Sequence, residues 1–291
     1  MIARIFSLLL AMLAVAPALQ AGPWENFSNF FSKKTYQAPP MLRILIVDRR
    51  PEVNVEVKGR YKIFDPRDNS HIATRKLGKR DQMAAESDGI RWGEQFPGVY
   101  QLLIVPEDMS IPVIVDGIEY RGAIYVYNIE GTLSVVNRAD MEHYLTSVLT
   151  PVFDDTAPQE LLAAAAITAR TNAYFMAENP KNPFWAVNAS QVDYMGYVPV
   201  NADAAINRAI NETRYMIMSK TGTYEGMVTP FPVVWEGIGD KVGSTGVGVK
   251  SKISFSEAET MAKKGDNAAQ ILQAAFPQTT IQMIYSAPGT H

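Results

Sequence analysis

The sequence predicts an α+β fold with a mainly antiparallel β N-terminal part, a central long helix packed on the sheet, and C-terminal helices. Three observations predict this class. Short β-branched runs separated by turn residues fill residues 41–150, and a long stretch without glycine or proline follows at 160–178. Helix start and stop signals then recur after residue 200.

The N-terminal half is predicted to form antiparallel hairpins. Its apolar runs are short, and clusters such as Asp65-Pro66, Asp116-Gly117 and Glu130-Gly131 separate them with the residues that β-turns prefer. The predicted strands cover residues 43–47, 53–57, 61–64, 99–105, 112–115, 123–127 and 132–136.

The long helix is predicted from Pro158 to residue 178, with Thr156 as its cap and the proline in its first turn. Its alanine-rich stretch at 161–166 is small on nearly every side, which favours close burial against a sheet. Replacing Ala165 by a larger residue should therefore destabilise the fold through overpacking.

The C-terminal part is predicted to alternate short helices with a strand. A helix is expected at 204–212, and a strand at 214–218. Ser256 and Glu259 have capping-box spacing, and Gly265 favours a left-handed helix end. A last helix is expected at 267–275.

Composition excludes several classes of protein. The 291 residues carry 27 Lys and Arg against 30 Asp and Glu, a net charge of −3, which disfavours nucleic acid as a partner. With no cysteine and only three histidines, disulfides, thiolate zinc sites and cysteine nucleophiles are excluded. No metal site and no cofactor are expected.

The N-terminus predicts export. Arg4 precedes an apolar run at 5–16 and a short polar end, so residues 1–21 have the pattern of a signal peptide. The run is shorter than the roughly 20 residues that a membrane span needs. Contact with a membrane is expected only if this segment stays uncleaved, and the mature protein is expected in the periplasm or cell envelope. Residues 22–40, which contain Pro39-Pro40, are predicted to be a linker.

A series of motifs in one order gives a resemblance to the SpoIID/LytB family. The N-terminal motifs are Tyr120-Arg121-Gly122, Leu133-Ser134-Val135-Val136-Asn137, Glu142-His143-Tyr144-Leu145, Glu160-Leu161-Leu162 and Ala169-Arg170-Thr171. The C-terminal ones are Gly246-Val247-Gly248, Met261-Ala262, Gly265, Ile271-Leu272, Phe276-Pro277 and Thr280. The resemblance implies one SpoIID/LytB-like domain at 41–285, followed by a tail at 286–291.

The resemblance also implies a place of action. Members of this family act on peptidoglycan in the bacterial envelope, some as lytic transglycosylases that cut glycan strands and others as modifiers of cell-wall amidases. The expected partners are therefore peptidoglycan glycan strands, with a cell-wall amidase as a further candidate.

The family's catalytic carboxylate is missing at the matching position. Active members carry a glutamate in the turn before the long helix, and an ungapped match places Val152 there. Cleavage of a glycosidic bond requires a group that gives and takes protons, which valine cannot do. Asp154 and Asp155 are the nearest candidates for a general acid/base, because two adjacent carboxylates can raise each other's pKa. The alternative is that both only complement the dipole of the following helix.

Other family positions define the predicted substrate-binding set: Glu142, Tyr144, Glu160, Arg170, Gln191 and Thr245. Thr245 replaces a family histidine, and Ala165 a glutamine. The segment that binds zinc in some relatives keeps Gln191 but not the metal ligands. Glu160 and Arg170 have a second interpretation as a buried polar support, because an arginine in an alanine-rich helix needs an acidic partner.

Two functions of different class remain from the sequence. In the first, the protein is a weakly catalytic or non-catalytic envelope factor that binds glycan strands or modulates a wall hydrolase. In the second, it is an active lytic transglycosylase that uses Asp154 or Asp155. An acid that points into a cleft beside Glu142, Tyr144 and Thr245 would favour the enzyme, and an apolar cleft floor would favour the binder.

Overall fold

The computed structural model describes residues 40–220, 230–236 and 243–284. The predicted signal peptide and nearly all of the predicted linker lie outside the described residues, as does the predicted tail. Among the described residues, no helix combines the length and apolar character that crossing a bilayer requires.

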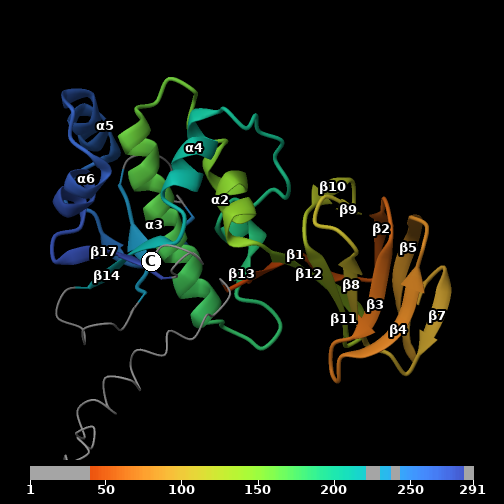
Figure 1. The fold of residues 1–291 in the computed structure, drawn as a ribbon. Helices are drawn as coiled ribbons and strands as arrows, with labels where there is room; N and C mark the ends of the chain where they lie inside the picture. Colours follow the sequence, from red (N-terminus) through yellow and green to blue (C-terminus); the bar gives the residue numbers. More distant parts are fainter. Residues whose placement is uncertain (1–39, 221–229, 237–242, 285–291) are drawn as a thin grey trace, which may run out of the picture. The chain divides into compact units, whose positions relative to one another are not determined.

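Two antiparallel sheets form the N-terminal part (Figure 1). Their strands are β1 (Leu42–Arg50), β2 (Glu52–Val57), β3 (Tyr61–Asp65), β4 (Ser70–Arg75), β5 (Lys79–Glu86), β6 (Gly89–Trp92), β7 (Glu94–Pro97), β8 (Gln101–Pro106), β9 (Val113–Val115), β10 (Ile118–Tyr120), β11 (Ala123–Ile129) and β12 (Thr132–Ala139). One sheet has the order β10-β9-β2-β5-β6-β7. The other has the order β13-β1-β12-β11-β8-β3-β4, in which the two-residue β13 (Val187–Asn188) pairs parallel to β1.

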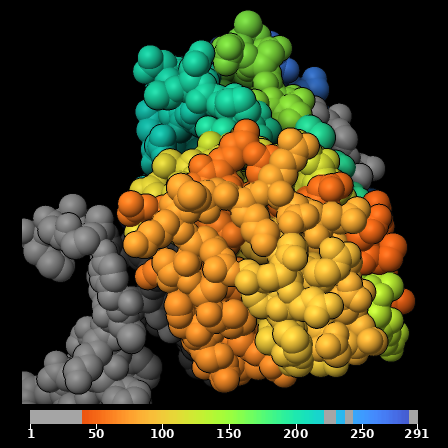
Figure 2. Space-filling view, turned by 90° about the vertical axis from the view of Figure 1, so that its right-hand side faces the viewer, coloured from red at the N-terminus to blue at the C-terminus, as the bar shows by residue number. Residues whose placement is uncertain are grey.

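Alternation of side chains along the strands builds the core of this part. In β2, Val53, Val55 and Val57 are buried, whereas Glu52 before them and Asn54 between them are exposed. This period of two places one apolar face of the strand inward. Figure 2 shows the surface that the orange and yellow residues of this part form.

All seven predicted strands are present, and five more were missed: β4, β5, β6, β7 and β10. The reason is clear in β5, whose sequence is KRDQMAAE and in which Met83 and Ala84 are the buried residues. Hydrogen bonding to β2 and β6 holds this polar segment extended. Because the segment contains no apolar run, its sequence does not predict a strand.

The C-terminal part is helical with small sheets. Its elements are α2 (Met141–Leu149), α3 (Gln159–Glu178), the 3₁₀ turn η1 (Ala189–Gln191), α4 (Ala205–Glu212), β14 (Met216–Lys220), β15 (Val233–Val234), β16 (Val249–Lys250), α5 (Phe255–Lys264), α6 (Ala268–Ala275) and β17 (Thr279–Met283). β14 pairs with β17, and β15 pairs with β16.

The long helix α3 is confirmed and lies at the centre of the helical part (Figure 1). Residues 161–173 are all buried, because α3 contacts α2, α4, α5, α6, β14 and β15 as well as β1 of the large sheet. The expected contact with the sheet is made at β1, but most neighbours of α3 are helices and β14. Small side chains allow these neighbours to approach closely.

Two polar side chains of α3 form hydrogen bonds with backbone groups of β14 and β15. The Thr171 hydroxyl accepts a hydrogen bond from the Met218 amide of β14 at 2.9 Å. The Asn172 side chain bonds both the amide and the carbonyl of Val233 in β15, at 2.8 and 3.0 Å. The buried helix thus holds the two short sheets by satisfying backbone groups that would otherwise be unpaired.

Two predicted helix caps were wrong in detail. Thr156 does not cap α3, because it donates its amide and hydroxyl hydrogens to Asp154, and the helix starts after Pro158 without a side-chain cap. The capping box of α5 is made by Ser254 and Glu257, two residues before the predicted pair. The same Ser-x-x-Glu spacing occurs twice here, and only the first places Phe255 in the buried first position of the helix. Gly265 ends α5 with φ of 100°, as predicted.

The buried alanine face of α3 predicts a cost of overpacking. Ala165 is fully buried, so Ala165→Leu should lower the free energy of unfolding by about 1 to 3 kcal/mol. Thermal or urea unfolding would measure the loss. Ala269→Leu, at an exposed position of α6, is the matched control and should change stability little. Equal stability of the two variants would contradict the burial of Ala165.

Candidate functional site

Helix α2 places the first member of the predicted site. The Asp140 carboxylate caps this helix by accepting hydrogen bonds from the amides of Glu142 and His143, at 2.9 and 3.4 Å. Met141 and Leu145 are buried below it, so Glu142 is fixed in the first turn. Helix α2 was not predicted from the sequence, although Asp140 directly before the apolar Met141 is a helix-start signal.

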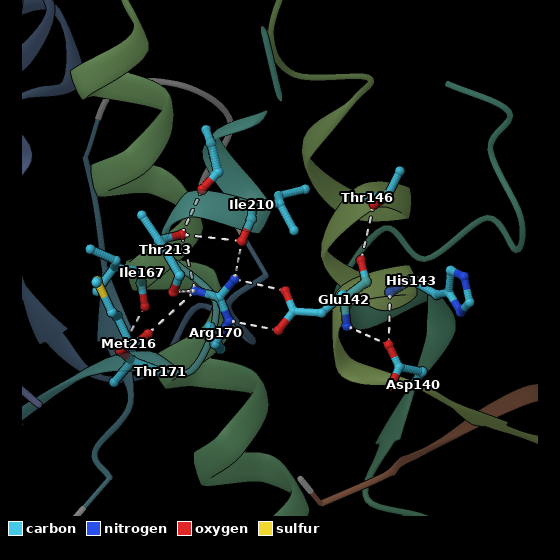
Figure 3. Close-up of polar contacts among 11 residues, drawn as sticks. Asp140, Glu142, His143, Thr146, Ile167, Arg170, Thr171, Ile210, Thr213 and Met216 are labelled. Carbon is cyan, nitrogen blue, oxygen red and sulfur yellow. Dashed lines mark hydrogen bonds and ion pairs between the residues drawn. The ribbon is translucent and has the colours of Figure 1, made fainter. Parts of the chain in front are cut away.

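Arg170 of α3 forms a two-point ion pair with Glu142 (Figure 3). Its Nε and one terminal nitrogen donate to the two carboxylate oxygens, at 3.2 and 2.7 Å. The Arg170 side chain is 1% exposed and that of Glu142 is 17% exposed. This fork-to-fork geometry is the strongest arrangement for an arginine and a carboxylate.

The remaining N–H groups of the Arg170 guanidinium donate hydrogen bonds to carbonyls at the C-terminal end of helix α4 and beyond it. These N–H groups donate to the carbonyls of Ile210 and Thr213, at 3.0 and 2.9 Å, and to the carbonyl of Met216 at 3.3 Å. Carbonyls at the end of a helix lack partners within it, and a cation is favourable there. Arg170 therefore joins α2, α3, α4 and β14.

This arrangement corrects the partner predicted for Arg170. The predicted partner was Glu160, in a buried polar support, whereas the structure pairs Arg170 with Glu142. Glu160 is exposed and accepts the amide hydrogen of Ala268 at 2.7 Å, at the start of α6. A carboxylate at a helix N-terminus is electrostatically favourable, so Glu160 fastens α6 to α3.

The remaining predicted binding residues lie apart from one another. Tyr144 is fully buried, its hydroxyl reaches the Gly243 carbonyl at 3.5 Å, and burial raises the pKa of that hydroxyl. Gln191 is exposed, and its side chain accepts the Asn188 amide hydrogen at 3.3 Å. Thr245 is half-buried. None of them, nor Glu142, Glu160 or Arg170, is among the residues that line four pockets in the described part of the chain.

The turn between α2 and α3 forms a small pocket of about 130 Å³. Its lining residues are Val152, Phe153, Asp154, Thr156, Ala157, Leu161, Phe255 and Glu259. Most of them are apolar, and the rings of Phe153 and Phe255 lie 5.3 Å apart. Phe255 and Glu259 come from α5, and the sequence analysis did not associate them with this turn.

Asp154 accepts hydrogen bonds from the amide and hydroxyl of Thr156, at 2.8 and 2.5 Å. Both bonds favour the ionised carboxylate and lower the pKa of Asp154 below its ordinary value. The expectation that Asp155 raises the pKa of its neighbour is therefore wrong for Asp154. Asp155 is exposed and does not line the pocket.

The turn and the ion pair lie at opposite ends of α2. Glu142 is in the first turn of this helix, and Val152 follows its last residue, Leu149. A nine-residue helix is roughly 13 Å long. About the length of α2 therefore separates Asp154 and Asp155 from Glu142. In the described part of the chain, no three His, Cys, Asp or Glu side chains gather as metal ligands would.

Comparison with known proteins identifies the family. Residues 129–219 match the family model described as SpoIID, Stage II sporulation protein, and this segment contains α2, α3, α4 and the Arg170 network. The chain therefore belongs to the SpoIID family and carries a SpoIID/LytB-like domain that is related to the cell wall.

Three relatives, all described as uncharacterized proteins, are similar over long stretches. A protein of Chlamydia pneumoniae is 29% identical over 262 residues, which cover 89% of this chain and 87% of the relative. One of Chlamydia muridarum is 30% identical over 250 residues, covering 85% and 79%. One of Brachyspira hyodysenteriae is 29% identical over 191 residues, covering 65% and 50%.

Removal of the acidic partner of Arg170 should destabilise the fold. Glu142→Ala leaves a buried guanidinium without a counter-charge, which should cost about 3 kcal/mol, the low end for a broken buried pair, because Glu142 keeps some exposure. Urea unfolding would measure this loss. Glu236→Ala, which breaks the exposed pair with Lys250, is the control and should cost about 1 kcal/mol at most. Equal losses in the two variants would contradict the role assigned to Glu142.

The hydrogen bonds of Asp154 predict its titration. Its folded pKa is lowered, so the stabilisation that it contributes is present above the ordinary aspartate pKa and is lost as the pH falls through the folded value. Carboxyl chemical shifts measured by NMR should show the low pKa in the wild type and a rise toward the ordinary value in Thr156→Val. A wild-type pKa above the ordinary value would instead make Asp154 suitable as a general acid.

Proposed function

We propose that this protein is an exported envelope factor that binds peptidoglycan glycan strands and does not cut them efficiently. The main support for this proposal is the set of side chains in the turn before α3. At the position where the resemblance implies a catalytic glutamate, the apolar Val152 lines a small mixed pocket, and the nearest acid, Asp154, is held ionised by Thr156.

The reaction of a lytic transglycosylase explains why this matters. One group must protonate the leaving oxygen and then accept a proton from the attacking sugar hydroxyl. A general acid has to hold its proton near neutral pH, which requires a raised pKa. Asp154 has a lowered pKa, and Glu142 is engaged by Arg170. Neither carboxylate is therefore suited to donate a proton to the leaving oxygen in the first step.

The size of the turn pocket supports the same conclusion. Pockets that enclose a drug-sized ligand usually measure about 300 to 1,000 Å³. The pocket at Val152 has about 130 Å³, so it does not enclose a disaccharide. Binding of a glycan strand along an open surface remains compatible with this geometry.

Location and partners follow from the sequence and the family. We propose export to the periplasm or cell envelope on the basis of the pattern at residues 1–21. The proposed partners are glycan strands and, as an alternative, a cell-wall amidase whose activity the protein modulates. The net charge of −3 gives no support to nucleic acid as a partner.

One observation favours the alternative of an active lytic transglycosylase. Glu259 of α5 lines the same pocket as Asp154, so two carboxylates reach it from different elements. Glu259 is paired with Lys263 at 2.7 Å, however, and Asp154 with Thr156. The enzyme hypothesis therefore requires Asp154 or Glu259 to leave its present partner, or the exposed Asp155 to turn into the pocket.

A paired assay of binding and cleavage tests the proposal. Wild-type protein mixed with purified peptidoglycan should sediment with it and release little soluble muropeptide. Asp154→Asn and Asp155→Asn should behave as the wild type in both measurements. Strong release by the wild type that disappears in either variant would establish the enzyme instead, and absence from the pellet would refute glycan binding.

The same assay can test the position of the missing acid. Val152→Glu should give at most a small release of muropeptide, because Thr245 and Ala165 also differ from the family pattern and catalysis tolerates misplacement poorly. Val152→Gln is the matched control of similar size that cannot donate a carboxylic proton. Release by both variants would exclude an acid at this position as the cause.

A further inference from the structure

Two adjoining pockets lie at one end of the N-terminal β part. They are built by the connection between β2 and β3, the connection between β4 and β5, and the end of β8. Their volumes are about 440 and 320 Å³. The lining residues are Arg60, Tyr61, Lys62, Thr74, Arg75, Lys76, Leu77, Gly78, Lys79 and Glu107, of which Tyr61, Thr74, Arg75 and Lys76 line both.

The charge of these pockets is opposite to that of the whole chain. Five Lys or Arg residues line them against one carboxylate, Glu107, although the chain has a net charge of −3. Arg75 is paired with Glu94, and Arg60 with Glu107 at 3.7 Å. Among the residues that the structure describes, Lys62 and Lys76 form no ion pair, so their charges face solvent and are open to an anion.

A buried donor is present in both pockets. Tyr61 is 1% exposed, and its hydroxyl lies near the Arg75 guanidinium but makes no hydrogen bond of normal geometry with a described residue. Burial raises the pKa of this hydroxyl, so it keeps its proton at neutral pH. An unpaired buried hydroxyl is unfavourable unless a ligand or water completes it, and an anion can accept its hydrogen.

An exposed apolar side chain stands beside the basic pockets. Leu77 is 81% exposed, the highest value for a large apolar residue in the described part of the chain, and it lies in the turn between Lys76 and Lys79. Gly78 fixes this turn, because a Cβ atom there would lie 2.5 Å from the Val57 carbonyl oxygen. The turn therefore packs closely against the backbone of β2 at Gly78 while the Leu77 side chain lies in solvent.

We propose that this end of the β part docks on an anionic lipid surface, with a headgroup phosphate in the basic pockets and Leu77 entering the apolar layer. The lysines and the Tyr61 hydroxyl supply donors for the phosphate. A charged patch and one apolar anchor are each weak, and together they provide the two signals that peripheral binding requires. A soluble anion would use the pockets but would leave Leu77 in water. This inference does not depend on glycan binding.

The test compares the full chain and its variants on vesicles. Co-sedimentation with phosphatidylglycerol vesicles should exceed that with phosphatidylcholine vesicles, and the difference should shrink as salt is raised. Lys62→Glu combined with Lys76→Glu should weaken binding to phosphatidylglycerol about tenfold or more, since each basic residue contributes about 1 kcal/mol near such a surface. Leu77→Ser and Tyr61→Phe should each weaken it severalfold.

Matched variants separate this site from general effects. Lys252→Glu removes an exposed charge elsewhere, and Met283→Ser removes an exposed apolar residue, so both should bind as the wild type. Unchanged melting temperatures would show that the pocket variants remain folded. Equal binding to both kinds of vesicle, or full binding by the double lysine variant, would overturn the proposal. A melting-temperature increase with inorganic phosphate but no vesicle binding would also overturn it, because it would assign the pockets to a soluble anion.

Discussion

The charge of Arg170 has to be neutralised inside the protein, and the arrangement of the SpoIID-type helices depends on how this is done. Moving a guanidinium from water to a site with 1% exposure is costly, and only a complete set of acceptors offsets that cost. The carboxylate of Glu142 and three carbonyls at the end of α4 and the start of β14 provide this set. Four elements are therefore fixed by one side chain.

The alanine-rich sequence of α3 makes this position reachable. Helices can approach α3 on nearly every side because residues 163–166 are alanines, and this closeness brings α2 and α4 to opposite sides of the Arg170 guanidinium (Figure 3). The same burial removes water from Thr171 and Asn172, whose side chains then bond the backbone of β14 and β15. Packing and polar contacts thus specify the same arrangement of elements.

The sequence predicted the class, the long helix and the apolar strands, because these depend on local periodicity. It did not predict β5, which is polar and is held extended by its neighbours, nor the partner of Arg170. Glu160 lies on the same helix as Arg170, but ten residues separate the two, roughly 15 Å along the axis. Glu142 is distant in sequence and close in space, and the fold alone brings the two together. The Val152 turn was located by resemblance, whereas its contacts with Phe255 and Glu259 were not.

Stability and catalysis make separate demands on this domain, because the ion pair and the turn lie at opposite ends of α2. A carboxylic acid in place of the half-buried Val152 would lie beside Phe153, Leu161 and Phe255, which would partly desolvate it. That desolvation is what raises a pKa for acid catalysis, and it also lowers stability. Valine removes this cost without touching Arg170 or its acceptors. An apolar residue at this turn is therefore compatible with a complete set of acceptors around Arg170, because the described residues of the two regions do not overlap.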